Sequence, residues 1–188
     1  MTLAVGVPAE DIGAAVDAGA VHLFRTDDDE LPLPQRWSVN QDTVSVAGVA
    51  ESGDRFGTTV VLGGPWREGL GQPLVVGVPG EDIGAVADAG SVQVFGDGTT
   101  APGNGDAGVT QPDLGDPAQT GDHFGAAVGT RNDALFVGAP DDVTYRTGAV
   151  HVIPWDRVFG GAGDDVVIRP GTDGVPVGAA RFGAALSP

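Results

Sequence analysis

The sequence predicts an all-β fold made of repeated, antiparallel, four-stranded sheets. Short valine-rich runs alternate with clusters of Gly, Pro and Asp, a pattern typical of many short strands joined by turns. Long segments of the chain also repeat one another, which indicates a repeat architecture. Gly and Pro account for 32 and 14 of the 188 residues, yet 41% of the residues are hydrophobic, so the chain has enough apolar side chains for a core.

The clearest repeat is an apolar run that ends in Gly-Val-Pro or Gly-Ala-Pro. It occurs at residues 3–8, 74–79 and 135–140. The first two copies continue with the same loop, Glu-Asp-Ile-Gly-Ala, and then with Asp-Ala-Gly before a second apolar run. This self-similarity covers about twenty positions, and it indicates one structural unit used several times.

A Phe-Gly pair recurs out of phase with the first landmark, at residues 56–57, 124–125 and 182–183. Both landmarks indicate a unit of roughly sixty to seventy residues. The chain is therefore expected to divide into four parts: a partial first repeat over 1–55, full repeats over 56–123 and 124–181, and the start of a further repeat over 182–188.

Each repeat is expected to hold four short strands. The first follows Phe-Gly, as at 57–62, and the second is the apolar run Leu74–Val78, whose consecutive apolar residues predict that both faces are covered. The third, Ser91–Phe95, alternates in polarity, which predicts less cover on one face. The fourth is expected near 37–39, 109–111 and 166–169. Four strands in each of several repeats describe the blades of a β-propeller.

Glycines stand at fixed places in the repeat. Gly19, Gly90 and Gly148 each precede a third strand, where a tight turn favours positive φ. The glycine of each Phe-Gly pair is expected to let neighbouring sheets approach closely, because it has no side chain. The phenylalanine of each pair is expected to anchor the core between sheets.

Phe-Gly, a strand, and then Gly-Ala-Pro, as in Phe124-Gly125 and Gly138–Pro140, resembles the FG-GAP repeat of integrin α-subunit heads, in its bacterial form. The resemblance implies a β-propeller, typically of seven blades, in an extracellular or cell-surface protein. About three blades fit in this chain, and the sequence begins within a repeat. We therefore expect a piece of a longer propeller, with an oligomeric ring as the alternative.

The charge excludes some partners. The formal charge is −17, with nine arginines and no lysine, which argues against nucleic acids and anionic membrane surfaces. The lack of cysteine excludes disulfides and cysteine-ligated zinc.

Calcium is the cofactor that acidic loops would bind. The calcium loop that the FG-GAP resemblance implies, between the first and second strands, lacks its ligands here. The candidates lie instead in the next loop: Glu10, Asp11, Asp17, Glu81, Asp82 and Asp88. The alternative interpretation is that these acidic residues form turns by hydrogen bonding to their own backbone.

The sequence predicts no catalytic residues, because its three histidines fall at repeat positions and no nucleophile–base pair is evident. Trp66 and Arg67, in a turn-rich loop, are the candidate residues for binding a protein or carbohydrate ligand. Trp155 is either a further exposed aromatic or a packed one. The expected function is a non-catalytic module for ligand binding, adhesion or scaffolding. The alternatives are an accessory domain of a larger secreted hydrolase or phospholipase, and a fragment without independent function.

Overall fold

The computed structural model describes residues 1–26, 31, 33–63, 71–98, 100, 102, 103, 106–131, 133–145, 147–172, 174–178 and 180–187. Within these residues the chain is an all-β protein, as predicted, with one short 3-10 helix, η1 (Gln111–Leu114), and one four-residue helix, α1 (Trp155–Val158). Neither is long and apolar enough to cross a membrane.

The strands form three antiparallel sheets. The first sheet contains β1 (Thr2–Val7), β2 (Ala20–Arg25) and β3 (Gln35–Val39) in that order. The second contains β4 (Thr59–Leu62), β5 (Leu74–Val78), β6 (Ser91–Phe95) and β7 (Ala107–Val109). The third contains β8 (Ala127–Thr130), β9 (Ala134–Ala139), β10 (Ala149–Pro154) and β11 (Val166–Ile168). Every neighbouring pair of strands is also consecutive in the chain.

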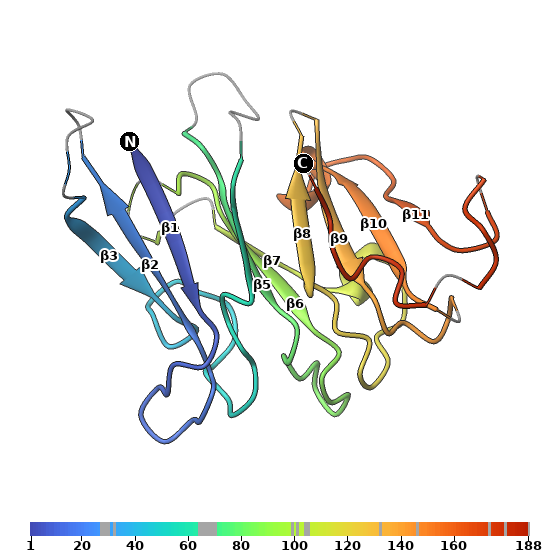
Figure 1. Cartoon of the computed structure of the whole chain (residues 1–188), viewed down its shortest axis with the longest axis horizontal. Helices are drawn as coiled ribbons and strands as arrows, with labels where there is room; N and C mark the ends of the chain where they lie inside the picture. The colour runs from blue at the N-terminus through green and yellow to red at the C-terminus, as the bar shows by residue number, and fades with distance from the viewer. Residues whose placement is uncertain are drawn as a thin grey trace.

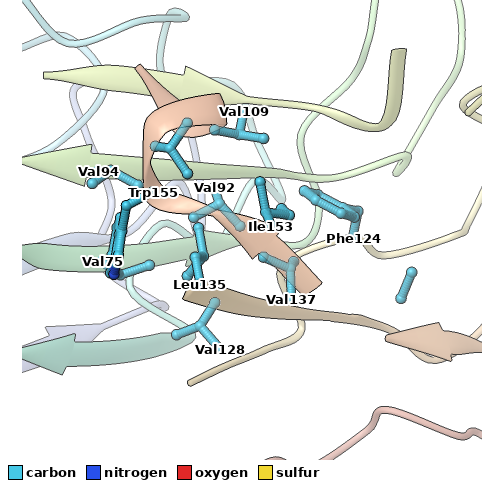
Figure 2. Packing of buried hydrophobic residues seen from close by; sticks show 12 residues of the cluster. Val75, Val92, Val94, Val109, Phe124, Val128, Leu135, Val137, Ile153 and Trp155 are labelled. Atoms are coloured by element: carbon cyan, nitrogen blue, oxygen red, sulfur yellow. The ribbon is translucent and has the colours of Figure 1, made fainter. Parts of the chain in front are cut away.

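The sheets stand side by side in chain order (Figure 1), and β4 of the second sheet contacts both β1 and β8. Each junction between sheets contains its own apolar core. Leu74, Val76 and Val78 of β5 pack in one cluster with Val21 and Val39 of the first sheet. A second core lies between the second and third sheets. Figure 2 shows Val75, Val92, Phe124, Leu135 and Ile153 among its side chains.

β5 is therefore covered on both faces, as its continuous apolar run predicts, and all five of its residues are buried. The prediction that the third strand is less covered on one face is wrong for β6, whose five residues are also all buried. The reason is that the second sheet lies between the other two. The polar side chain of Gln93 is accommodated because its Nε2 donates a hydrogen bond to the carbonyl of Ala47, at 3.2 Å.

Backbone hydrogen bonds join each sheet to the next at the Phe-Gly pairs. The N–H groups of Phe56 and Phe124 donate to the carbonyls of Ala18 and Ala89, at 2.8 and 2.9 Å, and Phe182 donates to Thr147 at 2.8 Å. Phe56 and Phe124 are completely buried, as expected of core anchors. The loop before the third strand of one sheet thus holds the start of the next sheet.

Glycines make this close approach possible. A Cβ atom added to Gly6, Gly77 or Gly138 would lie 2.0 Å from the carbonyl oxygen of the Phe-Gly glycine in the following repeat. Gly90, before β6, has φ of 87°, the positive value predicted for this turn. The Phe-Gly glycines are just as restricted, because a Cβ atom on Gly57, Gly125 or Gly183 would lie 2.8, 2.3 or 2.5 Å from a backbone carbonyl oxygen of the preceding repeat. The predicted roles of both sets of glycines are confirmed.

Candidate functional site

The two acidic loops that follow β1 and β5 have the same backbone structure. Ile12 and Ala15 exchange two backbone hydrogen bonds, of 2.9 and 3.0 Å, and Ile83 and Val86 do the same at 3.0 and 3.2 Å. Each loop is thus a small hairpin-like turn projecting beyond its sheet, at the lower end of the molecule in Figure 1.

The carboxylates of these loops make hydrogen bonds within the loop. Oδ1 of Asp11 accepts from the backbone N–H of Asp17 at 3.0 Å, and Oδ1 of Asp82 accepts from that of Asp88 at 2.9 Å. Asp17 and Asp88 have φ of 54° and 50°, a left-handed conformation that Asp tolerates better than most residues. These contacts are those of the turn-forming interpretation.

Among the described residues, neither set of predicted calcium ligands brings three ligand atoms within 4.8 Å of one another; the sets are Glu10, Asp11 and Asp17, and Glu81, Asp82 and Asp88. Calcium takes six to eight oxygen ligands. Calcium binding at these loops stays a prediction.

The aromatic candidates have different outcomes. Trp66 and Arg67, the predicted ligand-binding residues, lie outside the described residues. Trp155 is packed: its side chain belongs to the core in Figure 2, and its Nε1 donates to the carbonyl of Arg131 at 3.0 Å. Trp37 packs against Phe95, with 6.4 Å between ring centroids.

A pocket of about 430 Å³ opens where β4 and β8 begin and where β5 and β9 end. The described residues that line it occupy repeat-equivalent positions. Arg55, His123 and Arg181 each precede the phenylalanine of a Phe-Gly pair; the remaining lining residues are Thr58, Ala126, Ala184, Pro79, Pro140 and Asp141. Three copies of one sequence position therefore converge on one cavity.

The backbone of all three basic residues is left-handed, with φ of 59° at Arg55, 52° at His123 and 53° at Arg181. Such values are uncommon for side chains of this size, and they cost free energy unless the surrounding structure fixes them. Inter-sheet hydrogen bonds fix this backbone. The N–H of Arg55 donates to the backbone carbonyl of Asp17 at 3.1 Å, and the N–H of His123 donates to the backbone carbonyl of Asp88 at 3.2 Å. The same junctions that join the sheets thus aim these side chains at the pocket.

Asp141 links two of the basic residues. Its carboxylate lies 2.9 Å from Nδ1 of His123 and 2.9 Å from Nη1 of Arg181. In the preceding repeat the position of Asp141 is occupied by Gly80, so Arg55 has no carboxylate at that place. Among its described lining residues, the pocket therefore contains two guanidinium groups and one imidazole against a single carboxylate.

A buried polar layer lies within each junction between sheets. In the first junction, Nε2 of Gln41 donates to the carboxylate of Glu81, and Asp54 is completely buried close by. Burial raises the pKa of Glu81 to about 7 against the effect of the hydrogen bond from Gln41, and burial raises the pKa of Asp54 to about 6. In the second junction, Nε2 of Gln111 donates to Asp142 at 3.0 Å.

Neither a scan against protein-family models nor a search of the curated proteins finds a match to this chain.

Arg55, His123 and Arg181 stand at equivalent positions of the repeat, directly before each Phe-Gly pair, but the pocket that they line was not predicted from the sequence. Equivalence in a repeat shows which residues share a local environment, not whether neighbouring copies converge. The signal that could have indicated it is the recurrence of Arg or His at one position of a chain with 26 acidic residues, nine arginines and three histidines.

Proposed function

We propose that this chain is a non-catalytic β-propeller module of the FG-GAP type, and that it binds an anionic ligand in the pocket of Arg55, His123 and Arg181. As the FG-GAP resemblance implies, the module would act outside the cell or at its surface. The convergence of three basic residues on one cavity of a strongly acidic chain is the observation that carries this proposal.

The repeated junction between sheets supports the propeller. Each sheet presents the same loop to the Phe-Gly pair of the next repeat, through the same hydrogen bond of 2.8 to 2.9 Å. A contact that adds one sheet after another in the same way is what successive blades require. Equivalent residues of neighbouring blades then gather on one side, as Arg55, His123 and Arg181 do.

The chemistry of the pocket favours an acidic ligand. Guanidinium groups bind carboxylates and other oxyanions through paired N–H donors, and such bonds are among the strongest in proteins. Because Arg55 has glycine rather than aspartate at the position that corresponds to Asp141, its charge is available for a ligand. A sugar acid or an acidic peptide, each a member of the ligand classes expected from the sequence, would supply the anionic group.

The test is an array of acidic and neutral oligosaccharides and peptides, probed with the wild type, Arg55→Asn and Arg181→Asn. Asparagine removes the charge while tolerating the left-handed backbone of these positions. We expect the wild type to bind acidic members of the array, with binding about ten- to a hundredfold weaker in each variant, as for loss of a hydrogen bond to a charged group.

Arg36→Gln is the matched control, since it removes the same charge from β3, outside the pocket, and should leave binding unchanged. Binding to neutral members alone, or binding that survives both pocket variants, would contradict the proposal.

A further inference from the structure

A second group of polar side chains is buried between the second and third sheets, apart from the pocket. Asp116 follows η1, Asp142 follows β9, and His151 lies on β10. All three are buried, and one ligand atom from each lies within 4.8 Å of the other two. Residues from three chain segments therefore meet at one point between two sheets.

Several polar atoms of this cluster have no hydrogen-bond partner. Among the described residues, these are both ring nitrogens of His151, Oδ2 of Asp116 and Oδ1 of the neighbouring Asp122. The closest approaches of the imidazole are 3.6 Å, from Nε2 to Asp116, and 3.5 Å, from Nδ1 to Asp165. These distances are longer than normal hydrogen bonds. A buried polar atom without a partner destabilises the fold, so such a concentration calls for a ligand.

The charge of the cluster points to a cation. Asp122 and Asp142 are fully buried, and Asp116 is 9% exposed. Within the described part of the chain, no arginine forms an ion pair with any of these three. The nearby Arg169 instead lies over the ring of Tyr145, 5.0 Å from its centroid. Buried carboxylates normally have a paired cation or a metal ion.

The first junction shows what the same position looks like without such a cluster. Gln93 there is equivalent to His151, and its side chain is satisfied by the carbonyl of Ala47. The second junction has an imidazole in place of that amide, with Asp116 facing it. The first junction also holds carboxylates, Glu81 and Asp54, so what distinguishes the second junction is His151 together with Asp116.

We infer that Asp116, Asp142 and His151 bind a divalent transition-metal ion that joins the second sheet to the third. The 3.6 Å between Nε2 of His151 and Oδ2 of Asp116 is close to the spacing of about 3.4 Å between two ligands of a tetrahedral ion with bonds of about 2.1 Å. Imidazole with carboxylates suits zinc and similar ions, whereas calcium takes oxygen ligands.

The surroundings would hold these ligands in place. Oδ1 of Asp142 accepts from the backbone N–H groups of Thr144 and Tyr145, at 2.8 and 3.3 Å. Asp165 stands beside the second ring nitrogen of His151, where a carboxylate commonly orients a metal-bound imidazole. Phe124 packs edge-on against the same imidazole, with 5.3 Å between ring centroids, which limits its rotation.

The test uses the chelator-treated 188-residue chain, titrated with Zn²⁺ by calorimetry and followed in thermal melts. We expect one ion per chain and a rise in Tm of about 5–10 °C when free Zn²⁺ is about a hundredfold above Kd. His151→Gln installs the residue of the equivalent position 93, and it should abolish both effects. His22→Gln, at the equivalent position of the first sheet, is the matched control and should retain them.

NMR spectroscopy gives a second decisive result, should His151→Gln fail to fold. The chain has three histidines, so side-chain NMR resolves whether Zn²⁺ perturbs one imidazole in a one-to-one complex. Asp116→Asn should remove this perturbation, and excess Ca²⁺ should not. No stoichiometric uptake, a Tm shift that persists in His151→Gln, or no perturbed imidazole would overturn the inference.

Discussion

At the scale of single residues, Gly6, Gly77 and Gly138 decide how closely one sheet approaches the next. Each faces the carbonyl of a Phe-Gly glycine at a distance that leaves no room for a side chain. Backbone lies on both sides of the contact, so neither side can move away without breaking inter-sheet hydrogen bonds. The glycines of the Gly-Val-Pro, Gly-Ala-Pro and Phe-Gly motifs therefore recur because the packing between sheets requires them.

This requirement predicts the effect of Gly77→Ala. Its Cβ would lie 2.0 Å from the Gly125 carbonyl oxygen and 2.4 Å from Oγ1 of Thr59. We expect a loss of roughly 1–3 kcal/mol in the free energy of unfolding, measured by urea denaturation. Gly129→Ala, also within a strand, is the control, because its nearest neighbour would be 3.7 Å away. Equal stability of the two variants would contradict the packing argument.

A second prediction at this scale concerns pH. Glu81 and Asp54 bind protons more tightly in the folded chain, since burial raises their pKa from 4.5 to about 7 and from 3.8 to about 6. Their contribution to stability is therefore fully present below the unfolded pKa values and is lost as the pH rises through 6 and 7.

We expect the midpoint urea concentration of the wild type to decrease as the pH is raised from about 5 to about 8. The midpoint of Glu81→Gln should decrease less over the same range. Glu10→Gln removes an exposed carboxylate at the equivalent loop position and serves as the matched control. A drop of the same size in Glu81→Gln would show that Glu81 is not the group responsible.

At the scale of elements, the loops after β1 and β5 can be tested as turns. Oδ1 of Asp82 caps the backbone N–H of Asp88 at 2.9 Å, and an asparagine side chain can accept the same bond. Asp82→Ala should therefore lower the free energy of unfolding by about 1 kcal/mol, while Asp82→Asn should leave it nearly unchanged. Urea denaturation with and without Ca²⁺ separates this role from calcium binding, because a stabilisation by Ca²⁺ that Asp82→Asn abolishes would favour the metal.

The strands could be predicted from the sequence because clusters of turn-forming residues lie regularly at their ends. The expected second strand at Leu74–Val78 matches β5, and the fourth, expected near 109–111, is β7 at Ala107–Val109. The displaced end has a physical reason: Pro112 cannot donate a hydrogen bond to a sheet, and the chain turns into η1. α1 was not expected, since Trp155–Val158 has no capping signal.

The buried cluster was not predicted because its members are distant in the sequence. His151 was explained by the repeat, and Asp116 lies in a loop whose length differs from that of its counterpart. Only the packing of the third sheet against the second brings Asp116, Asp142 and His151 together. One feature of the sequence could have indicated the cluster. The same repeat position is occupied by His22, Gln93 and His151 in successive repeats, so its side chain varies between an imidazole and an amide.

At the scale of the whole molecule, charge is the dominant property. The formal charge of −17 means that most surface charges repel one another in the folded chain, and screening by salt weakens this repulsion. The basic pocket is a local exception, and an anionic ligand bound there would be released more easily as salt rises. Stability and ligand binding should therefore respond to ionic strength in opposite directions.

We accordingly expect the Tm to rise between about 20 mM and about 500 mM NaCl, while the affinity for an acidic ligand falls. Thermal melts and binding titrations on the same sample measure the two effects, with Arg55→Asn and Arg36→Gln as the pair that separates pocket charge from overall charge. Because either substitution makes the net charge more negative by the same amount, both should increase the salt dependence of Tm equally. Only Arg55→Asn should reduce the salt dependence of binding. A Tm that falls with salt would instead mean that ion pairs such as Arg181–Asp141 contribute more to stability than the net repulsion removes.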